Sequence, residues 1–254
     1  MPRSNDSEPN YANWVSSKLV FVPAAIAVLL GGLSIASPWF ALPAVLLLAT
    51  SAYFGYARWQ FSPQGAGIQP RIQALVLRHL DWDGKGRVLD IGCGNGPITI
   101  AVAKDYPDAR VTGIDPWGAS WEYSKAVCER NAAIEGVARS VTFQKGSAVA
   151  LPFDDGSFDV VVSNLVFHEV RDVSDKRLLI KEALRVLREG GQFVFQDLFL
   201  WKQVYGDPAA LVGEIRSWGI ERTELVLTNN CEFIPKALKL PFMVGTIAIL
   251  HGRK

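Results

Sequence analysis

Two long apolar runs lie near the start of the sequence, at residues 19–37 and 40–57, separated only by Pro38-Trp39. From residue 19 to residue 57 the tyrosine hydroxyls are the only ionisable groups. Each run is close to the ~20 residues that a helix needs to cross the apolar core of a bilayer. The pattern therefore predicts a hairpin of two transmembrane helices.

The charges beside the hairpin predict its orientation. Lys18 precedes the first run, Arg58 follows the second, and the connecting turn carries no charge. Because basic residues favour the cytoplasmic side, we expect both ends of the hairpin, and the domain that follows, on that side of a membrane. Two alternatives stay open: a signal peptide cleaved after the small residues Ser34-Ile35-Ala36, and a soluble helical cap or dimer interface.

From residue 68 onward, apolar segments with helical spacing alternate with short, nearly continuous apolar runs typical of buried parallel strands. This alternation predicts an α/β fold, a Rossmann-like, doubly wound and mostly parallel sheet of seven strands. The predicted strands are residues 87–91, 110–114, 141–144, 158–163, 192–198, 223–227 and 245–250. The predicted helices are residues 70–80, 98–105, 119–134 and 174–187.

These patterns divide the chain into four parts. Residues 1–17 form a polar tail that we expect to be disordered, since they are rich in Ser, Asn and Pro. The membrane hairpin covers residues 18–60, and a Gly- and Pro-containing joint covers residues 61–67. Residues 68–254 form the α/β domain, in which Gly190-Gly191 is expected to end the last long helix and to begin a strand.

A glycine-rich loop carries the strongest chemical signal. The first strand of the domain ends at Asp90, glycine occupies positions 92, 94 and 96, and Pro97 opens a helix. Glycines at this spacing let a backbone turn tightly and approach a ligand. A second strand ends at Asp115, and the carboxyl ends of neighbouring parallel strands face one crevice. The two elements predict a site for a nucleotide-like cofactor.

The spacing of the glycines favours one cofactor over another. In the dinucleotide fingerprint Gly-x-Gly-x-x-Gly the third glycine lies one position later, where this chain has Pro97. The carboxylate of Asp90 suits a cationic amino group better than a diphosphate. S-adenosylmethionine carries such an ammonium group and no phosphate, so we expect it rather than a nicotinamide dinucleotide.

Four motifs resemble those of the class I S-adenosylmethionine-dependent methyltransferases. They are Leu89-Asp-Ile-Gly-Cys-Gly-Asn-Gly96, Gly113-Ile-Asp-Pro116, Leu151-Pro-Phe-Asp-Asp-Gly-Ser-Phe-Asp-Val-Val161 and Ala183-Leu-Arg-Val-Leu-Arg-Glu-Gly-Gly-Gln-Phe-Val194. Within that family the chain is most similar to the branch of quinone-ring and sterol methyltransferases. The resemblance covers residues 68–254 and implies a transferase that converts S-adenosylmethionine into S-adenosylhomocysteine.

The resemblance also implies roles for individual residues. The methionine part of the cofactor would be held by Asp90, Gly92, Gly94 and Gly96. Asp115 would accept the ribose hydroxyls, and Pro116 or Trp117 would cover the adenine. Ser147 and Ala148 would lie at the adenine edge, and Asn164 under the cofactor. Many relatives have an acid where this chain has Ser147, so the contact to the adenine amine loses a charge.

Candidate acid–base residues follow the predicted fourth strand. His168 and Glu169 lie where an acceptor should approach, and a histidine with a pKa near neutral suits proton transfer. The alternative is a solvated loop, and Asp197 is a weaker candidate for the same role. Aromatic residues between positions 199 and 242 suit an apolar acceptor, although a hydrophobic cap has the same composition. We therefore expect a small lipophilic substrate that arrives from the bilayer.

Overall composition excludes several other classes. The net charge is +1 without a basic tract, so no nucleic-acid partner is expected. The three cysteines form no Cys-x-x-Cys pair, which argues against a metal site or a disulfide framework. Two other functions stay open: a membrane-tethered, non-catalytic cofactor-binding scaffold and an NAD(P)-dependent oxidoreductase. The pattern indicates neither the acceptor atom nor the oligomeric state.

Overall fold

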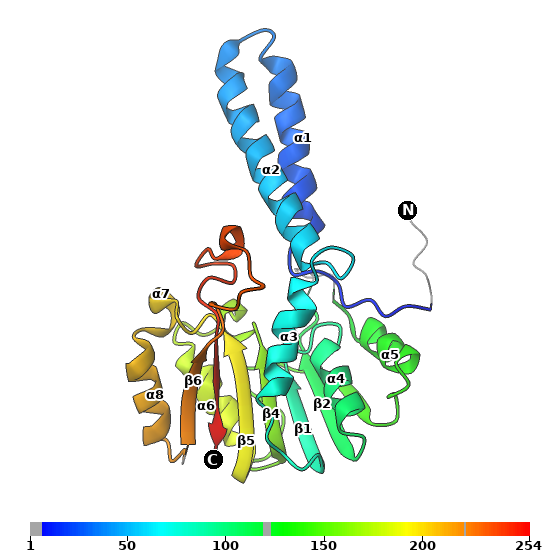
Figure 1. The fold of residues 1–254 in the computed structure, drawn as a ribbon, viewed down its shortest axis with the longest axis vertical. Coiled ribbons are helices and arrows are strands. Elements are labelled where there is room, and N and C mark those ends of the chain that lie inside the picture. The colour runs from blue at the N-terminus through cyan, green and yellow to red at the C-terminus, as the bar shows by residue number, and fades with distance from the viewer. Residues whose placement is uncertain (1–6, 119–122, 221) are drawn as a thin grey trace. The chain divides into compact units, whose positions relative to one another are not determined.

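The computed structural model describes residues 7–118, 123–220 and 222–254 (Figure 1). The chain divides into two compact units. The hairpin unit comprises Ala12–Ile72, and the sheet unit comprises the residues up to Tyr11 together with Gln73–Lys254. The division falls within helix α3 (Ile68–Arg78) rather than at residues 61–67, where the composition of the chain changes.

Two apolar helices make up most of the hairpin unit. They are α1 (Ser17–Leu33) and α2 (Ala41–Phe61), joined through the short 3₁₀ helix η1 (Pro38–Phe40). The helices pack against each other, and the Ser51 hydroxyl of α2 donates a hydrogen bond to the carbonyl of Val20 at 2.8 Å. Among the described residues, only the helical segment Pro38–Phe61 is long and apolar enough to cross a membrane, and α1 is shorter.

The sheet unit is built on a single sheet in the order β3-β2-β1-β4-β5-β7-β6 (Figure 1). The strands β1 to β5 run parallel to one another, whereas β7 is antiparallel to both β5 and β6. This arrangement confirms the predicted seven-stranded, mostly parallel sheet. The strands are β1 (Gly86–Ile91), β2 (Ala109–Asp115), β3 (Val141–Lys145), β4 (Phe158–Asn164), β5 (Leu187–Asp197), β6 (Arg222–Leu227) and β7 (Ala248–Arg253).

Helices cover both faces of this sheet and bury its apolar residues. Alternate strand residues point to opposite faces. Val88 and Val160 pack with α3 and α4, whereas Leu89 and Val161 pack with α6 and α8. The remaining helical elements are α4 (Pro97–Asp105), α5 (Lys125–Ile134), η2 (Phe167–Glu169), α6 (Arg177–Arg185), α7 (Lys202–Tyr205), α8 (Pro208–Ser217) and η3 (Lys236–Leu238).

Two local predictions were wrong. The pair Gly190-Gly191 lies inside β5, which begins at Leu187, because α6 already ends at Arg185. Gly190 has φ +71°, and the pairing of β5 with β4 shifts register here, so the glycines form an irregularity in the strand. The predicted helix 119–134 begins only at Lys125, and residues 119–122 lie outside the described residues.

The polar tail is also more ordered than its composition predicts. The backbone N–H of Asn10 donates to Oδ1 of Asn131 at 2.9 Å, and the Asn131 amide donates back to the Asn10 carbonyl at 2.9 Å. Nδ2 of Asn95 donates to the same carbonyl at 3.2 Å. Short polar sequences without an apolar face give no signal for such a contact, and residues 1–6 lie outside the described residues.

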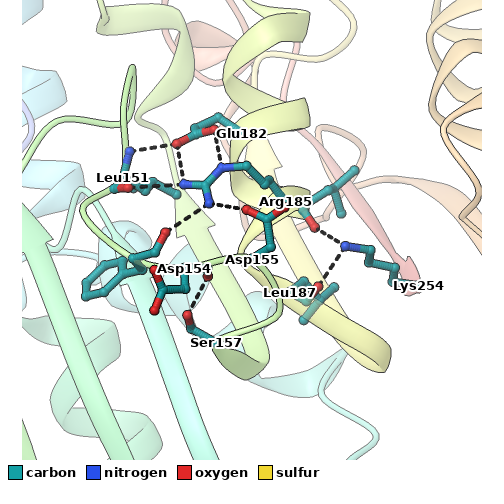
Figure 2. A network of polar contacts seen from close by, with 10 residues as sticks. Leu151, Asp154, Asp155, Ser157, Glu182, Arg185, Leu187 and Lys254 are labelled. Carbon is teal, nitrogen blue, oxygen red and sulfur yellow. Dashed lines mark hydrogen bonds and ion pairs between the residues drawn. The ribbon is translucent and has the colours of Figure 1, made fainter.

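An arginine network holds the connection between β3 and β4 against α6 (Figure 2). Arg185 donates to the carboxylates of Glu182 and Asp155 at 2.9 and 2.6 Å, and to the carbonyl of Leu151 at 3.1 Å. The backbone N–H of Leu151 in turn donates to Glu182 at 2.7 Å. Because this connection begins at the carboxyl edge of the sheet, the network fixes the segment that carries Ser147.

Candidate functional site

The glycine loop between β1 and α4 closes onto the neighbouring strand β2. The backbone N–H groups of Gly92 and Cys93 both donate to the carbonyl of Ile114, at 2.8 and 3.0 Å. Gly92 has φ +71°, which favours glycine, and a Cβ atom there would lie 2.2 Å from Cγ2 of Val166. Gly92 is therefore required both by the turn and by the side chain packed over it.

Asp115, at the end of β2, links this loop to the segment that follows it. Its Oδ2 accepts from the N–H of Gly94 at 3.0 Å, and its Oδ1 accepts from the N–H of Trp117 at 2.7 Å. Burial raises the pKa of this carboxyl, while the two N–H donors oppose the increase. A carboxylate has about four acceptor positions, so Asp115 can still accept hydroxyl groups from a ligand.

Trp117 lies across the glycine loop instead of standing free. Its indole Nε1 donates to the carbonyl of Gly94 at 2.9 Å, and its ring packs against a cluster that contains Cys93 and Phe143. Trp117 has φ +43°, a left-handed conformation that is strained for a tryptophan. Pro116 beside it is exposed. Both residues predicted to cover the adenine therefore lie next to the loop.

Asp90 is a buried acid on the inner side of the same loop. Only 2% of its surface is exposed, and its Oδ2 accepts from the hydroxyl of Thr99 at 2.6 Å. Burial raises the pKa of Asp90 to about 7, although the hydrogen bonds from Thr99 favour the charged form. The carboxyl thus changes its charge close to neutral pH, and a cation placed nearby would favour ionisation.

Asn164 ends β4 beside the end of β1 and carries an unused acceptor. Its Oδ1 is buried and has no hydrogen-bond partner among the described residues. The next residue, Leu165, has φ +56°, so the chain turns sharply here. A buried carbonyl oxygen without a donor is costly unless a ligand or water supplies one. This atom therefore indicates a ligand position at the carboxyl edge of β4.

Ser147 and Ala148 follow β3 at the same edge of the sheet. The hydroxyl oxygen of Ser147 accepts from the N–H of Val149 at 3.2 Å, and Ser147 also forms a bridge with Ala150. Ala148 is buried against the large core cluster. The structure thus places these two residues in a tight turn at the carboxyl edge of β3, and the described hydrogen bonds join neither of them to the glycine loop.

His168 lies in η2 and pairs with a buried acid. Its Nδ1 is 2.6 Å from Oδ1 of Asp197, at the end of β5, and only 15% of the His168 side chain is exposed. Burial by itself lowers the pKa of His168, but the charge and hydrogen bond of Asp197, helped by Glu169, raise it to about 10. His168 therefore carries a proton at neutral pH and does not accept another.

Glu169 stands next to this pair and is more exposed. Its Oε1 lies 3.4 Å from Nε2 of His168, and 46% of its side chain is accessible. The hydrogen bond from His168 lowers the pKa of Glu169 despite the opposing effect of burial. Of the two predicted acid–base residues, Glu169 is thus the one that has a free lone pair at neutral pH. Their catalytic roles stay predictions.

Asp197 has a structural task that the sequence did not reveal. Besides His168, its carboxylate accepts from the N–H groups of Val166 at 3.1 Å, Phe167 at 2.8 Å and Leu198 at 2.6 Å. One buried side chain thereby holds both the histidine and the segment after β4. The sequence showed only an acid at the end of a long apolar strand. Its partners Val166, Phe167 and His168 lie in the segment after a different strand, β4.

Two further residues of the site also went unnoticed. Thr99, in the first turns of α4, holds Asp90. Asn95 is almost fully buried, and its Oδ1 accepts from the N–H of Ser124 at 3.1 Å while its Nδ2 reaches the Asn10 carbonyl. Of these two, only Thr99 had a signal in the sequence, since it lies in the first turn of the helix that follows the glycines.

Comparison with known proteins identifies the central part of this unit. Residues 89–195 match a methyltransferase domain. Over 108 residues the chain is 34% identical to a demethylmenaquinone methyltransferase of Lactococcus lactis, a match that covers 42% of this chain and 40% of that protein. The chain spans less than half the length of the curated relatives it matches.

Solved structures show the same fold. The [4+2]-cyclase SpnF superposes with a TM-score of 0.56 at 22% identity, covering 73% of this chain and 81% of that one. A geranyl diphosphate C-methyltransferase of Streptomyces coelicolor, solved with S-adenosyl-L-homocysteine, gives 0.55 at 14% identity and covers 73% and 79%. The predicted Rossmann-like methyltransferase fold is therefore confirmed.

The residues of the methyltransferase domain fit S-adenosylmethionine. The glycine cradle leaves no room for a Cβ at position 92, Asp90 offers a carboxyl for a cationic amino group, and Asn164 offers an unused acceptor. The domain match supports this cofactor as well. Among the described residues, no group of three or more His, Cys, Asp or Glu side chains could hold a metal ion.

The raised pKa of Asp90 leads to a pH-dependent prediction. An ammonium group near Asp90 lowers its pKa, so cofactor binding should release a proton from a large fraction of these carboxyls at pH 6.5 and from few of them at pH 8.5. Without cofactor, the same raised pKa makes the free energy of unfolding fall as pH rises from about 4 to about 7, because the folded protein binds the extra proton.

Calorimetry in two buffers with different ionisation enthalpies measures that proton release. Asp90→Asn is the control, since it keeps the shape of the side chain but has no proton to lose. We expect the wild-type protein to release more protons than the variant at pH 6.5, where the amino group of the cofactor is already charged. Equal release by the two proteins at pH 6.5 would show that the cofactor does not act on the charge of Asp90.

Proposed function

We propose that the chain is a membrane-anchored, S-adenosylmethionine-dependent methyltransferase that acts on a small lipophilic acceptor from the cytoplasmic side. The observation that carries the proposal is the arrangement of Asp90, the glycine loop and Asp115 inside a matched methyltransferase domain. When bound, the cofactor supplies a methyl group on a sulfonium sulfur. The remaining task of the protein is to hold the donor and acceptor in line.

The proposal assigns binding roles that the contacts within the site support. Asp90 and the Oδ1 of Asn164 face the amino end of the methionine part, where a buried acid and an unused acceptor favour an ammonium group. Asp115 accepts the ribose hydroxyls with its remaining lone pairs. Trp117 and Pro116 would cover the adenine, and Ser147 and Ala148 would lie at its edge.

His168 and Glu169 divide the acid–base work. Where the acceptor is a hydroxyl or an enol, the carboxylate of Glu169 takes its proton, and the acceptor oxygen becomes an anion. The imidazolium of His168, held by Asp197, then stabilises that negative charge without giving up its own proton. Asp197 is a positioning residue in this scheme, since it acts through His168 and the backbone of residues 166–168.

The hairpin unit supports a membrane location. Its helices expose many large apolar side chains, among them Phe21, Val28 and Leu42, each more than two-thirds exposed. The turn between the helices exposes Ile35 and Trp39, which are 92% and 88% accessible. Apolar surface of this extent is stable only against lipid or a partner. Residues 19–57 lack charge, and the basic residues beside them support a cytoplasmic location for both ends of the hairpin.

The relatives support a lipophilic acceptor only by analogy. The names of several relatives specify methylation of demethylmenaquinone, and the solved C-methyltransferase was crystallised with geranyl diphosphate. The demethylmenaquinone methyltransferases match only part of this chain, and the C-methyltransferase matches only its fold. A fold neighbour named as a [4+2]-cyclase shows that the same architecture is not restricted to methyl transfer. Because the architecture by itself does not determine the reaction, a cofactor-binding scaffold without methyl transfer is the second candidate function.

Calorimetry with purified full-length protein in detergent shows which cofactor binds, and so distinguishes a protein that uses S-adenosylmethionine from an oxidoreductase. We expect saturable binding of S-adenosylmethionine and of S-adenosylhomocysteine at the same single site, and no heat with NADH. Binding of NADH in place of S-adenosylmethionine would favour the oxidoreductase. Asp115→Asn turns one oxygen that accepts from a backbone N–H into a donor and weakens the contact to the ribose hydroxyls, so we expect the dissociation constant for S-adenosylmethionine to rise by about tenfold.

A further inference from the structure

The segment that joins β6 to β7, residues 228–247, displays apolar side chains on the surface of the sheet unit. Phe242 is 55% exposed and Leu240 37%, and Leu227 at the end of β6 is 53% exposed. In the described part of the sheet unit, the other large exposed apolar side chains are those of Val149 and Leu178. This β6–β7 loop thus concentrates apolar exposure in a short stretch of chain.

The backbone of the β6–β7 loop is held in place. The N–H groups of Met243 and Gly245 both donate to the carbonyl of Leu240 at 3.0 Å, and the Thr246 hydroxyl donates to the carbonyl of Pro241 at 2.7 Å. Leu238 and Val244 are buried on either side of the turn. The apolar side chains between them are therefore presented outward by a fixed turn, since their neighbours already fill the core.

The register of the strands places this loop at the edge of the sheet that carries the candidate site. Ala248, the first residue of β7, pairs with Asp197 of β5 and with Leu227 of β6. The N–H of Leu200, just after β5, donates to the carbonyl of Thr246 at 3.0 Å. The loop therefore extends beyond the carboxyl end of β5, as Figure 1 also shows.

The charges of the loop suit an anionic surface. Lys236 is exposed and Lys239 is half-buried, and both precede the Leu240–Phe242 turn. Glu232 is the one acid of residues 228–247. Lysine stems lie along an apolar surface while their ammonium groups reach the polar layer, which is the arrangement found at the interface of a bilayer.

We infer that the β6–β7 loop docks on the surface of a bilayer that contains anionic lipids, with Leu240 and Phe242 in the interfacial layer. The inference rests on the proposed function, in which the acceptor is lipophilic. A second copy of the chain fits less well, because a stable dimer buries about 800 Å² on each partner and a few side chains supply much less. In this arrangement the carboxyl edge of the sheet, where Asn164 and Asp197 lie, faces the lipid.

Lipid-depth quenching on the full chain in nanodiscs tests this contact. Cys93 and Cys128 are buried, so a Cys231→Ser background leaves a single accessible label site after Phe242→Cys is introduced. A fluorophore at position 242 should shift to shorter wavelength and be quenched by spin-labelled lipids in phosphatidylserine-containing nanodiscs. Replacing phosphatidylserine by phosphatidylcholine, or introducing Lys236→Gln and Lys239→Gln together, should reduce that quenching.

The matched control is a label at Lys85→Cys in the same background. Lys85 is exposed and precedes β1, so it lies at the opposite edge of the sheet, and its label should respond to aqueous iodide and not to spin-labelled lipid. Equal iodide access at positions 242 and 85 would overturn the inference. Shielding of position 242 in detergent without lipid, growing with protein concentration, would also overturn it in favour of a second copy.

The two proposals fail in different experiments. Lipid quenching at position 242 does not depend on cofactor, and cofactor binding in detergent does not depend on the loop. Quenching without binding of S-adenosylmethionine would leave the docking surface standing and remove the proposed function. Binding of S-adenosylmethionine with an iodide-accessible position 242 would do the opposite.

Discussion

Gly92→Ala should weaken S-adenosylmethionine binding by at least about 100-fold, a loss of about 2.7 kcal/mol. The new Cβ would lie 2.2 Å from Cγ2 and 2.9 Å from Cβ of Val166, so the whole valine must move. Val166 cannot move freely, because its N–H is bound by Asp197. The loop must therefore distort, and alanine at φ +71° adds strain of about 1 kcal/mol. Calorimetric titration measures the change.

Two variants separate overlap from strain. Gly136→Ala has nearly the same left-handed φ, +76°, but nothing lies within 4 Å of the added Cβ, so cofactor binding should be unchanged. Gly92→Ala combined with Val166→Ala removes both overlapping Cγ atoms and leaves only the Cβ of residue 166 at 2.9 Å, so it should recover part of the lost binding. A Gly92→Ala protein that binds the cofactor normally would show that the loop does not form the cradle.

Asp197→Asn should lower the free energy of unfolding by about 3 kcal/mol, because it breaks a buried charge pair and turns an acceptor into a donor. Four donors converge on this carboxylate, three of them backbone N–H groups. The pKa of His168 should fall well below about 10, since only Glu169 then opposes the lowering effect of burial. Denaturation in detergent and histidine-selective NMR measure the two effects.

The stabilisation that the His168–Asp197 pair contributes depends on pH. The folded protein raises the pKa of His168, so the stabilising contribution of the pair is complete just below pH 6.5 and is lost as pH rises towards 10. Burial and pairing have opposite effects on Asp197, and the net result is a lowered pKa, so the same contribution is lost again at strongly acidic pH. In Asp197→Asn the loss between pH 6.5 and 10 should disappear.

Asp207→Asn is the control for that substitution. Asp207 caps α8 by accepting from two backbone N–H groups, and it is exposed, so asparagine serves nearly as well as a cap. We expect a change below about 0.5 kcal/mol in the free energy of unfolding. If Asp197→Asn were equally mild, or if His168 still titrated near pH 10, the charge pair would not organise this site.

The regular parts of the fold were predictable because their signals are local. Apolar runs located all seven strands, most of them to within three residues, and the glycine spacing with Asp90 and Asp115 predicted the cofactor loop. These features depend on neighbours in sequence and on the general rule for parallel sheets. The position of β5 was less accurate, since a glycine pair signals a helix end as well as a strand irregularity.

Contacts between distant segments were not predictable. The pairing of His168 with Asp197 joins residues 29 positions apart, and the contact of Asn10 with Asn131 spans 121 positions. A histidine next to a glutamate indicates proton transfer, but whether the histidine is charged depends on an acid from another strand. Likewise, Phe242 is exposed because its neighbours Leu238 and Val244 already fill the core. The sequence shows that all three are apolar, but not which of them is buried.

Methyl transfer in proteoliposomes tests the central claim most directly. Full-length protein is incubated with methyl-tritiated S-adenosylmethionine and either a membrane-lipid extract or a water-soluble metabolite extract, and labelled products are followed by an added mass of about 14 Da. We predict label in a lipid-phase product, dependent on Asp115 and abolished by Gly92→Ala. Stoichiometric cofactor binding with no label leaving the cofactor in either extract would contradict the account and favour the scaffold.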